Sequence, residues 1–215
     1  MIIAVDGTAG SGKGTLSKEL STVLKLKHLD TGLLYRAVSL EIINLKIDKK
    51  NFELNAIKVA ESFSWKKLNG FNHNLLRSSE VSNLASSLAK ISKVRKSLLT
   101  FERKFAYTNF KGYNGTILDG RDIGSVILPN ADYKFFLDAD LKIRAKRRTQ
   151  ELIEQGNQVF ENQVLKDMAK RDKTDKTRKN APLIKANDAF FIDTSYKSIK
   201  EVLGIALKVI DSHKS

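Results

Sequence analysis

Five short segments with the form of buried strands recur along the chain, and each is followed directly by an aspartate. They cover residues 2–5, 27–29, 116–118, 134–137 and 190–192. Segments with helical periodicity separate them, near residues 14–25, 32–46, 52–63, 79–90, 92–109, 141–154, 160–173 and 196–211. Because neighbouring parallel strands need crossover helices, this alternation predicts an α/β fold in three layers, with a five-stranded parallel sheet between helices.

One interval between the predicted strands is too long for a single crossover helix. It runs over residues 31–115, and we therefore expect a small inserted subdomain within it. A second break, Gln155-Gly156-Asn157, separates two predicted helices and could act as a hinge.

Composition excludes several classes of protein. The chain has 215 residues, 41% of them hydrophobic, which suits one packed domain rather than a disordered chain. Its lack of cysteine excludes a disulfide scaffold, a thiolate nucleophile and a Cys-based metal site. No apolar run approaches the ~20 residues that span a bilayer, and the first residues lack a basic leader. We therefore expect a soluble, cytoplasmic protein.

The charge is strongly unbalanced. Lys and Arg total 38 against 24 Asp and Glu, for a formal net charge of +14. An excess of this sign is typical of proteins that bind nucleic acid. Only ten of these cations are arginines, however, and the lysines are scattered along the chain, which favours a solvated surface instead.

The most specific local pattern is glycine-rich. The segment Gly7-Thr8-Ala9-Gly10-Ser11-Gly12-Lys13-Gly14-Thr15 follows a predicted strand and opens a predicted helix. Glycines allow backbone N–H groups to surround phosphates, and the helix N-terminus adds its positive dipole end. Lys13 would reach the β- and γ-phosphates, and Thr15 would offer a hydroxyl to Mg²⁺. We therefore expect this chain to bind a nucleoside triphosphate.

Three further segments narrow the class of phosphate-binding protein. Gly-x-Gly-Lys-Gly-Thr is the form found in nucleoside monophosphate kinases. Three segments resemble the signatures of bacterial cytidylate kinases. They are Asp30-Thr31-Gly32-Leu33-Leu34-Tyr35-Arg36, Asp119-Gly120-Arg121-Asp122-Ile123-Gly124, and Arg171-Asp172-x-x-Asp175-x-x-Arg178 with Ala181-Pro182-Leu183. The resemblance covers essentially the whole chain in the right order. It implies ATP-dependent transfer of phosphate to CMP and dCMP, with Mg²⁺.

The resemblance also implies which residues form the site. The expected catalytic residues are Lys13, Arg121 and Arg171, and ATP is expected at Gly7, Thr8, Ala9, Gly10, Ser11, Gly12, Lys13, Gly14 and Thr15. The expected CMP-binding residues are Thr31, Tyr35, Arg36, Arg77, Ser86, Arg95, Arg121, Asp122, Asp175 and Arg178. Thr15 is the expected Mg²⁺ ligand. Asp119 could orient the metal through water or cap the next turn.

Roles within the acceptor site follow the same resemblance. Arg36 and Arg121 would clamp the CMP phosphate, while Thr31, Asp175 and Arg171 would hold the sugar and the phosphate side. Ser86, Arg95, Asp122 and Arg178 would frame the cytosine, although base, sugar and phosphate roles could exchange. Side-chain chemistry agrees, because arginine binds phosphate in bidentate fashion and a carboxylate accepts from the exocyclic amine of cytosine.

Domain limits and partners are the remaining expectations. The resemblance implies a core of residues 1–60, 112–150 and 179–215, a monophosphate-binding insert at about 61–111 and a lid at about 151–178. It also implies a monomer whose partners are nucleotides, without nucleic acid or membrane. Arg144, Arg147 and Arg148 could meet ATP, but a charged helix face is slightly favoured.

The acceptor chemistry predicts catalysis without a general base. A monophosphate is already ionised, so alignment and charge neutralisation suffice for in-line transfer. All three histidines, His28, His73 and His213, lie outside the motifs. Two other functions remain open from the residues alone, a small-molecule P-loop kinase that acts on a different monophosphate and a nucleic-acid-binding P-loop ATPase.

Overall fold

The chain folds into two compact units, seen here in a computed structural model that describes residues 1–47, 51–64, 71, 73–76, 78–154 and 156–212. The first unit comprises Met1–Leu29 and Asn109–Ser215, and the second comprises Asp30–Thr108. Residues 61–108 of the predicted insert lie in the second unit, which also contains residues 30–60.

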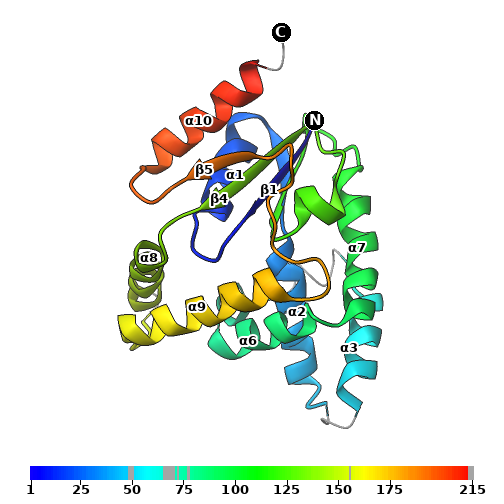
Figure 1. Cartoon of the computed structure of the whole chain (residues 1–215). Coiled ribbons are helices and arrows are strands. Elements are labelled where there is room, and N and C mark those ends of the chain that lie inside the picture. Colours follow the sequence, from blue (N-terminus) through cyan, green and yellow to red (C-terminus); the bar gives the residue numbers. More distant parts are fainter. Residues whose placement is uncertain (48–50, 65–70, 72, 77, 155, 213–215) are drawn as a thin grey trace. The chain divides into compact units, whose positions relative to one another are not determined.

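A parallel sheet forms the centre of the first unit. Within the described ranges its five strands lie in the order β2-β3-β1-β4-β5, and Figure 1 shows β4 between β1 and β5. The strands are β1 (Ile2–Gly7), β2 (Leu26–Asp30), β3 (Gly115–Gly120), β4 (Tyr133–Asp138) and β5 (Phe190–Asp193). The central strand β1 pairs in parallel with β3 on one side and with β4 on the other.

Helices complete the first unit. They are α1 (Lys13–Val23), α8 (Leu141–Glu154), α9 (Glu161–Thr177), α10 (Ile199–Ser212) and a π-helical turn, η2 (Ile123–Ile127). One face of the sheet packs against α1 and α10, and Ile3, Val5 and Phe135 are buried there with Leu20 and Ala206. A smaller apolar cluster joins α8 to α9 through Ala145, Val164 and Met168.

The second unit is helical in the part that the structure describes. Its helices are α2 (Thr31–Asn44), α3 (Phe52–Glu61), α5 (His73–Leu76), α6 (Ser79–Leu88) and α7 (Ser92–Ala106). Helix α2 packs against α3 and α6, and α3 packs against α7. Phe63 and Phe101 meet edge to face with ring centroids 5.6 Å apart. None of the helices described in either unit has the length and apolar composition to cross a membrane.

The predicted five-stranded parallel sheet is confirmed. Each strand extends by one to three residues beyond the predicted limits, because backbone pairing continues beyond the predicted segments, as where Asp6 pairs with Gly120. The predicted helices are also present. The short elements α5 and η2 were not predicted, since η2 has no helical periodicity of its own and is held by a tertiary contact.

That contact comes from Asp6 at the end of β1. Its carboxylate accepts hydrogen bonds from the backbone N–H groups of Ile123 and Gly124, each at 2.7 Å. The side chain is buried, and burial raises the pKa of Asp6 to about 7 while the two N–H donors act in the opposite direction. Because η2 follows Arg121 and Asp122 directly, Asp6 fixes the backbone that carries both of these residues.

The substitution Asp6→Asn tests this burial through the pH dependence of stability. The folded protein keeps the Asp6 proton up to about pH 7, whereas an unfolded chain loses it near 3.8. The unfolded state therefore binds fewer protons between these values, and the contribution of Asp6 to stability falls as the pH rises.

Urea unfolding of both proteins from about pH 5 to about pH 8 measures the effect. The stability of the wild type relative to Asp6→Asn should decrease up to about pH 7 and level off above it. A difference in stability between the two proteins that does not change with pH would contradict the raised pKa of Asp6.

Candidate active site

The glycine-rich loop joins β1 to α1, and its backbone has the shape that an anion-binding loop needs. A side chain at Gly7 would place its Cβ 2.1 Å from the carbonyl oxygen of Leu137 on β4, so only glycine fits. Gly12, which precedes α1, has φ of 85°, in the left-handed region that favours glycine. The loop thus turns sharply into a helix whose first N–H groups are oriented toward a ligand.

Three carbonyl groups of the loop are bound by side chains of the protein. The Lys13 ammonium donates to the Thr8 oxygen at 3.3 Å, and the Thr194 hydroxyl donates to the Ser11 oxygen at 2.9 Å. Arg144 donates through Nη1 to the Ala9 oxygen at 3.0 Å. Because these acceptors are engaged within the protein, the loop offers mainly N–H donors to a ligand, which suits phosphate.

An acidic residue lies beside the first turn of α1. Asp119, on β3, is buried, and its Oδ1 is 4.0 Å from where a Cβ on Gly14 would lie. Its Oδ2 is 2.6 Å from Nε2 of His28 on β2. Thr15 follows Gly14 in the same helical turn, so a hydroxyl and a carboxylate are available near the end of the loop.

These groups fit Mg²⁺ bound together with a nucleotide. The described part of the chain contains no group of three or more His, Cys, Asp or Glu side chains that could hold a metal alone. Mg²⁺ usually retains several waters and takes one or two protein ligands together with substrate phosphates. A threonine hydroxyl and one nearby carboxylate are therefore a sufficient set.

A second charged cluster lies at the end of β3 and on α9. Arg121 donates through Nε to Asp175 at 2.9 Å, and Arg171 lies 4.0 Å from the same carboxylate. Arg178 lies 4.0 Å from Asp175 and 3.4 Å from Asp122. Three arginines predicted from the sequence are thus gathered around two carboxylates within the first unit.

Burial and charge act in opposite directions on Asp175. Burial raises its pKa, but the nearby charges of Arg121, Arg171 and Arg178 outweigh this and hold the pKa below its usual value. The carboxylate is therefore ionised at neutral pH, and the cluster carries more positive than negative charge. A phosphate group is a suitable additional partner for it.

Arg178 lies just beyond the helix. The i, i+4 and i+7 spacing of Arg171, Asp175 and Arg178 would place all three along one face of a continuous helix, but α9 ends at Thr177 and Arg178 is extended, with ψ of 140°. Its Nε donates to the Ala181 oxygen at 2.7 Å instead. Arg178 still lies near Asp175 because the chain turns there.

The remaining acceptor-site residues belong to the second unit. Thr31, Tyr35 and Arg36 lie in the first turns of α2, with Thr31 buried and the other two half-buried. Ser86 is half-buried on α6, and the guanidinium carbon of Arg95 on α7 lies 5.9 Å from the centre of the Tyr35 ring. Arg77 lies outside the described residues.

The three arginines of α8 differ from one another. Only Arg148 fits a charged helix face, since it pairs with the exposed Glu151 at 3.0 Å. Arg144 is buried and pairs with Asp172 of α9 at 2.7 Å, in addition to its bond to the loop. Arg147 donates to the Thr194 oxygen at 2.7 Å. Arg144 therefore connects the glycine-rich loop with α9.

Sequence reasoning missed His28 and Asp6 as parts of the site, and it slightly favoured a surface role for Arg144. His28 lies within one predicted strand and Asp6 directly follows another, and both make their key contacts with residues far away in the chain. The strand-end position of Asp6 was a usable signal. His28 had none, because nothing local identifies its partner.

Comparison with known proteins agrees with the motifs. A model of the cytidylate kinase family matches residues 3–212. The cytidylate kinase of Nitrobacter winogradskyi is 43% identical over 212 residues, which cover 99% of this chain and 96% of that protein. The cytidylate kinase of Bartonella henselae is 41% identical over 210 residues, covering 98% and 94%.

A solved structure shares the fold. An uncharacterized protein from Eubacterium ventriosum aligns with a TM-score of 0.55 at 17% identity, and the alignment covers 99% of each chain. At this identity the likeness supports the fold alone.

Arg144→Leu should destabilise the protein far more than Arg148→Leu. The first change leaves Asp172 without its buried ionic partner and the Ala9 carbonyl without a donor, which typically costs about 3–5 kcal/mol. The second removes an exposed pair worth at most about 1 kcal/mol. Urea unfolding measures both free energies, and equal losses would contradict the buried role of Arg144.

Proposed function

Because this chain belongs to the cytidylate kinase family, we propose that it phosphorylates dCMP as well as CMP, with ATP as the donor and CDP or dCDP as product. Family membership makes it an ATP-dependent kinase of CMP. The use of dCMP and the mechanism that follows are the proposal.

The observation that carries the mechanism is the register between β1 and β3. Asp6 pairs with Gly120, so the glycine-rich loop and Arg121 leave neighbouring strands at the same level. In-line transfer needs a donor and an acceptor phosphate side by side, and two phosphate-binding features at adjacent strand ends meet this need. The carboxyl ends of parallel strands are also where α/β proteins usually bind ligands.

The donor side uses the loop. Its N–H groups hold the ATP phosphates, and Lys13 shifts from the Thr8 oxygen to the β- and γ-phosphates. Thr15 and, through water, Asp119 would hold Mg²⁺. When bound, Mg²⁺ neutralises negative charge on the phosphates and keeps them in register.

The acceptor residues of the proposal are those that the sequence motifs indicate. Arg36, Arg121 and Arg171 bind the CMP phosphate, and Thr31 and Asp175 hold the sugar. The cytosine is framed by Ser86, Arg95, Asp122 and Arg178, while Tyr35 and Arg77 complete the acceptor site. Asp122 is suited to the exocyclic amine of cytosine, since a carboxylate accepts from that group and uracil has none there.

Transfer needs no general base. The acceptor oxygen is already ionised, and Arg121 and Lys13 stabilise the charge that spreads over the moving phosphoryl group. Closure of the predicted insert, about 61–111, and lid, about 151–178, would keep water from the γ-phosphate. The monomeric state and a cytoplasmic location stay predictions from the sequence.

A coupled assay of ADP release tests the function with CMP, dCMP, UMP, AMP and GMP as acceptors. We expect turnover with CMP and dCMP. Turnover with the other three should be much slower, because none of them presents an exocyclic amine where cytosine has its own. The same assay with DNA and RNA tests whether the net charge of +14 reflects a function with nucleic acid. Turnover that depends on UMP, AMP or a polynucleotide but not on CMP would overturn the proposal.

Arg121→Ala should lower kcat by about 10²–10³-fold, because it removes one preorganised donor for the transferring phosphoryl group. The fold should persist, since Asp175 keeps Arg171 and Arg178 as neighbours. Steady-state kinetics and thermal unfolding measure the two effects, with the exposed Arg148→Ala as the matched control. Near-normal turnover of Arg121→Ala would remove this residue from the site.

A further inference from the structure

The His28–Asp119 contact is the strongest side-chain pair that the mechanism above does not use. Nε2 of His28 and Oδ2 of Asp119 are 2.6 Å apart, with the two side chains 17% and 4% exposed. A carboxylate is only an acceptor, so the ring nitrogen that faces it carries the proton and donates. The bond joins neighbouring strands, β2 and β3, through residues 91 positions apart.

Both residues face the helix that follows the glycine-rich loop. Side chains alternate along a strand, so His28 shares a face with Leu26, and Asp119 shares a face with Ile117. Leu26 and Ile117 belong to the core that packs against α1. The pair therefore lies under α1, and the other Asp119 oxygen is the one near Gly14 in its first turn.

We propose that His28 is a positioning residue, which holds one oxygen of Asp119 so that the other stays directed at the Mg²⁺ waters near Thr15. This proposal rests on the proposed function, because that function gives Asp119 its role in holding Mg²⁺. Histidine suits the task because its planar ring places a single donor at fixed reach. Without that donor Oδ2 of Asp119 loses its bond to β2, and loss of such an outer partner typically lowers metal affinity or activity by about 10- to 100-fold.

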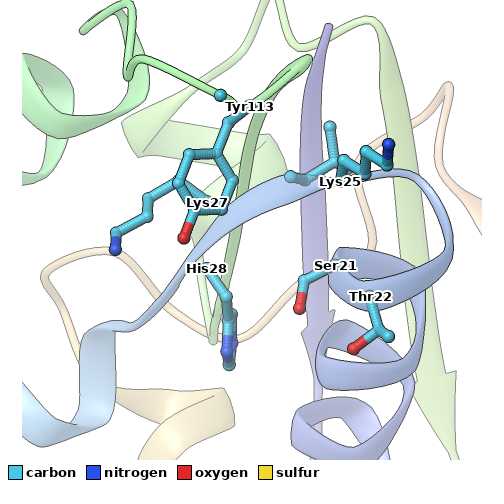
Figure 2. Close-up of a pocket in the computed structure, with 8 residues that line it drawn as sticks. Ser21, Thr22, Lys25, Lys27, His28 and Tyr113 are labelled. Carbon is cyan, nitrogen blue, oxygen red and sulfur yellow. The ribbon is translucent and has the colours of Figure 1, made fainter.

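The surroundings of His28 provide a matched control. His28 lines a cavity of about 540 Å³ with Ser21, Thr22 and Tyr113, and Figure 2 shows Ser21 and Thr22 on α1 beside it. The Ser21 hydroxyl donates to the Lys18 oxygen within α1. Ser21→Ala therefore changes the same cavity without touching the His28–Asp119 bond.

His28→Gln and His28→Asn separate hydrogen bonding from simple packing. The glutamine amide reaches about as far as Nε2 of histidine and keeps the donor, whereas the asparagine amide is one carbon shorter and cannot reach Asp119. Both are polar amides that differ by one methylene group, so a difference between them in Mg²⁺ dependence at equal thermal stability reports the bond. Thermal unfolding of each variant checks the fold.

Two measurements test the proposal. The first is the Mg²⁺ concentration that gives half-maximal CMP phosphorylation, which should rise about 10- to 100-fold in His28→Asn and stay near the wild-type value in His28→Gln and Ser21→Ala. The second is the calorimetric affinity for a non-hydrolysable ATP analogue. His28→Asn should bind the analogue more weakly with Mg²⁺ present and as well as the wild type in EDTA.

The outcomes separate the proposals from each other. Equal behaviour of His28→Gln and His28→Asn, or an affinity loss in EDTA as large as that with Mg²⁺, would overturn the role of His28. A wild type that fails to phosphorylate CMP would overturn the proposed function instead. The calorimetric arm would still test His28 in that case, because it needs no acceptor.

Discussion

The pairing of β1 with both β3 and β4 is the constraint on which the phosphate-binding features of the first unit depend. It brings the ends of three strands to one level, so that short polar segments follow them at neighbouring positions. Each segment is then fixed by a bond to another: Asp6 holds the turn after Arg121, and Asp138 accepts from Thr8 of the loop at 2.6 Å. A site of this kind is a property of the sheet and cannot be assigned to one motif.

The positive charge of the chain has two parts. The arginines with strong contacts are buried or half-buried, and each lies near a carboxylate or a carbonyl group that fixes its direction. Most lysines are exposed instead. Net charge therefore says little about the partner, whereas the few arginines with defined geometry indicate compact phosphate groups.

The fold was predictable because its signals are local and repeated. Five strand-like segments with a following aspartate give the sheet, and glycine spacing gives the loop. The contacts that order the site were not predictable. His28–Asp119, Asp6 with η2, and Arg144–Asp172 each join segments far apart in sequence. The end of α9 at Thr177, just before Arg178, was not predictable either.

The Arg121–Asp175 bond has a consequence for affinity. An arginine with an internal carboxylate partner is already partly neutralised, so an additional anion gains less attraction from it than from an arginine that has no such partner. The partner also fixes the direction of the guanidinium before any ligand arrives. A phosphate bound by Arg121 would therefore be held at a defined place but only moderately tightly, which would favour its release.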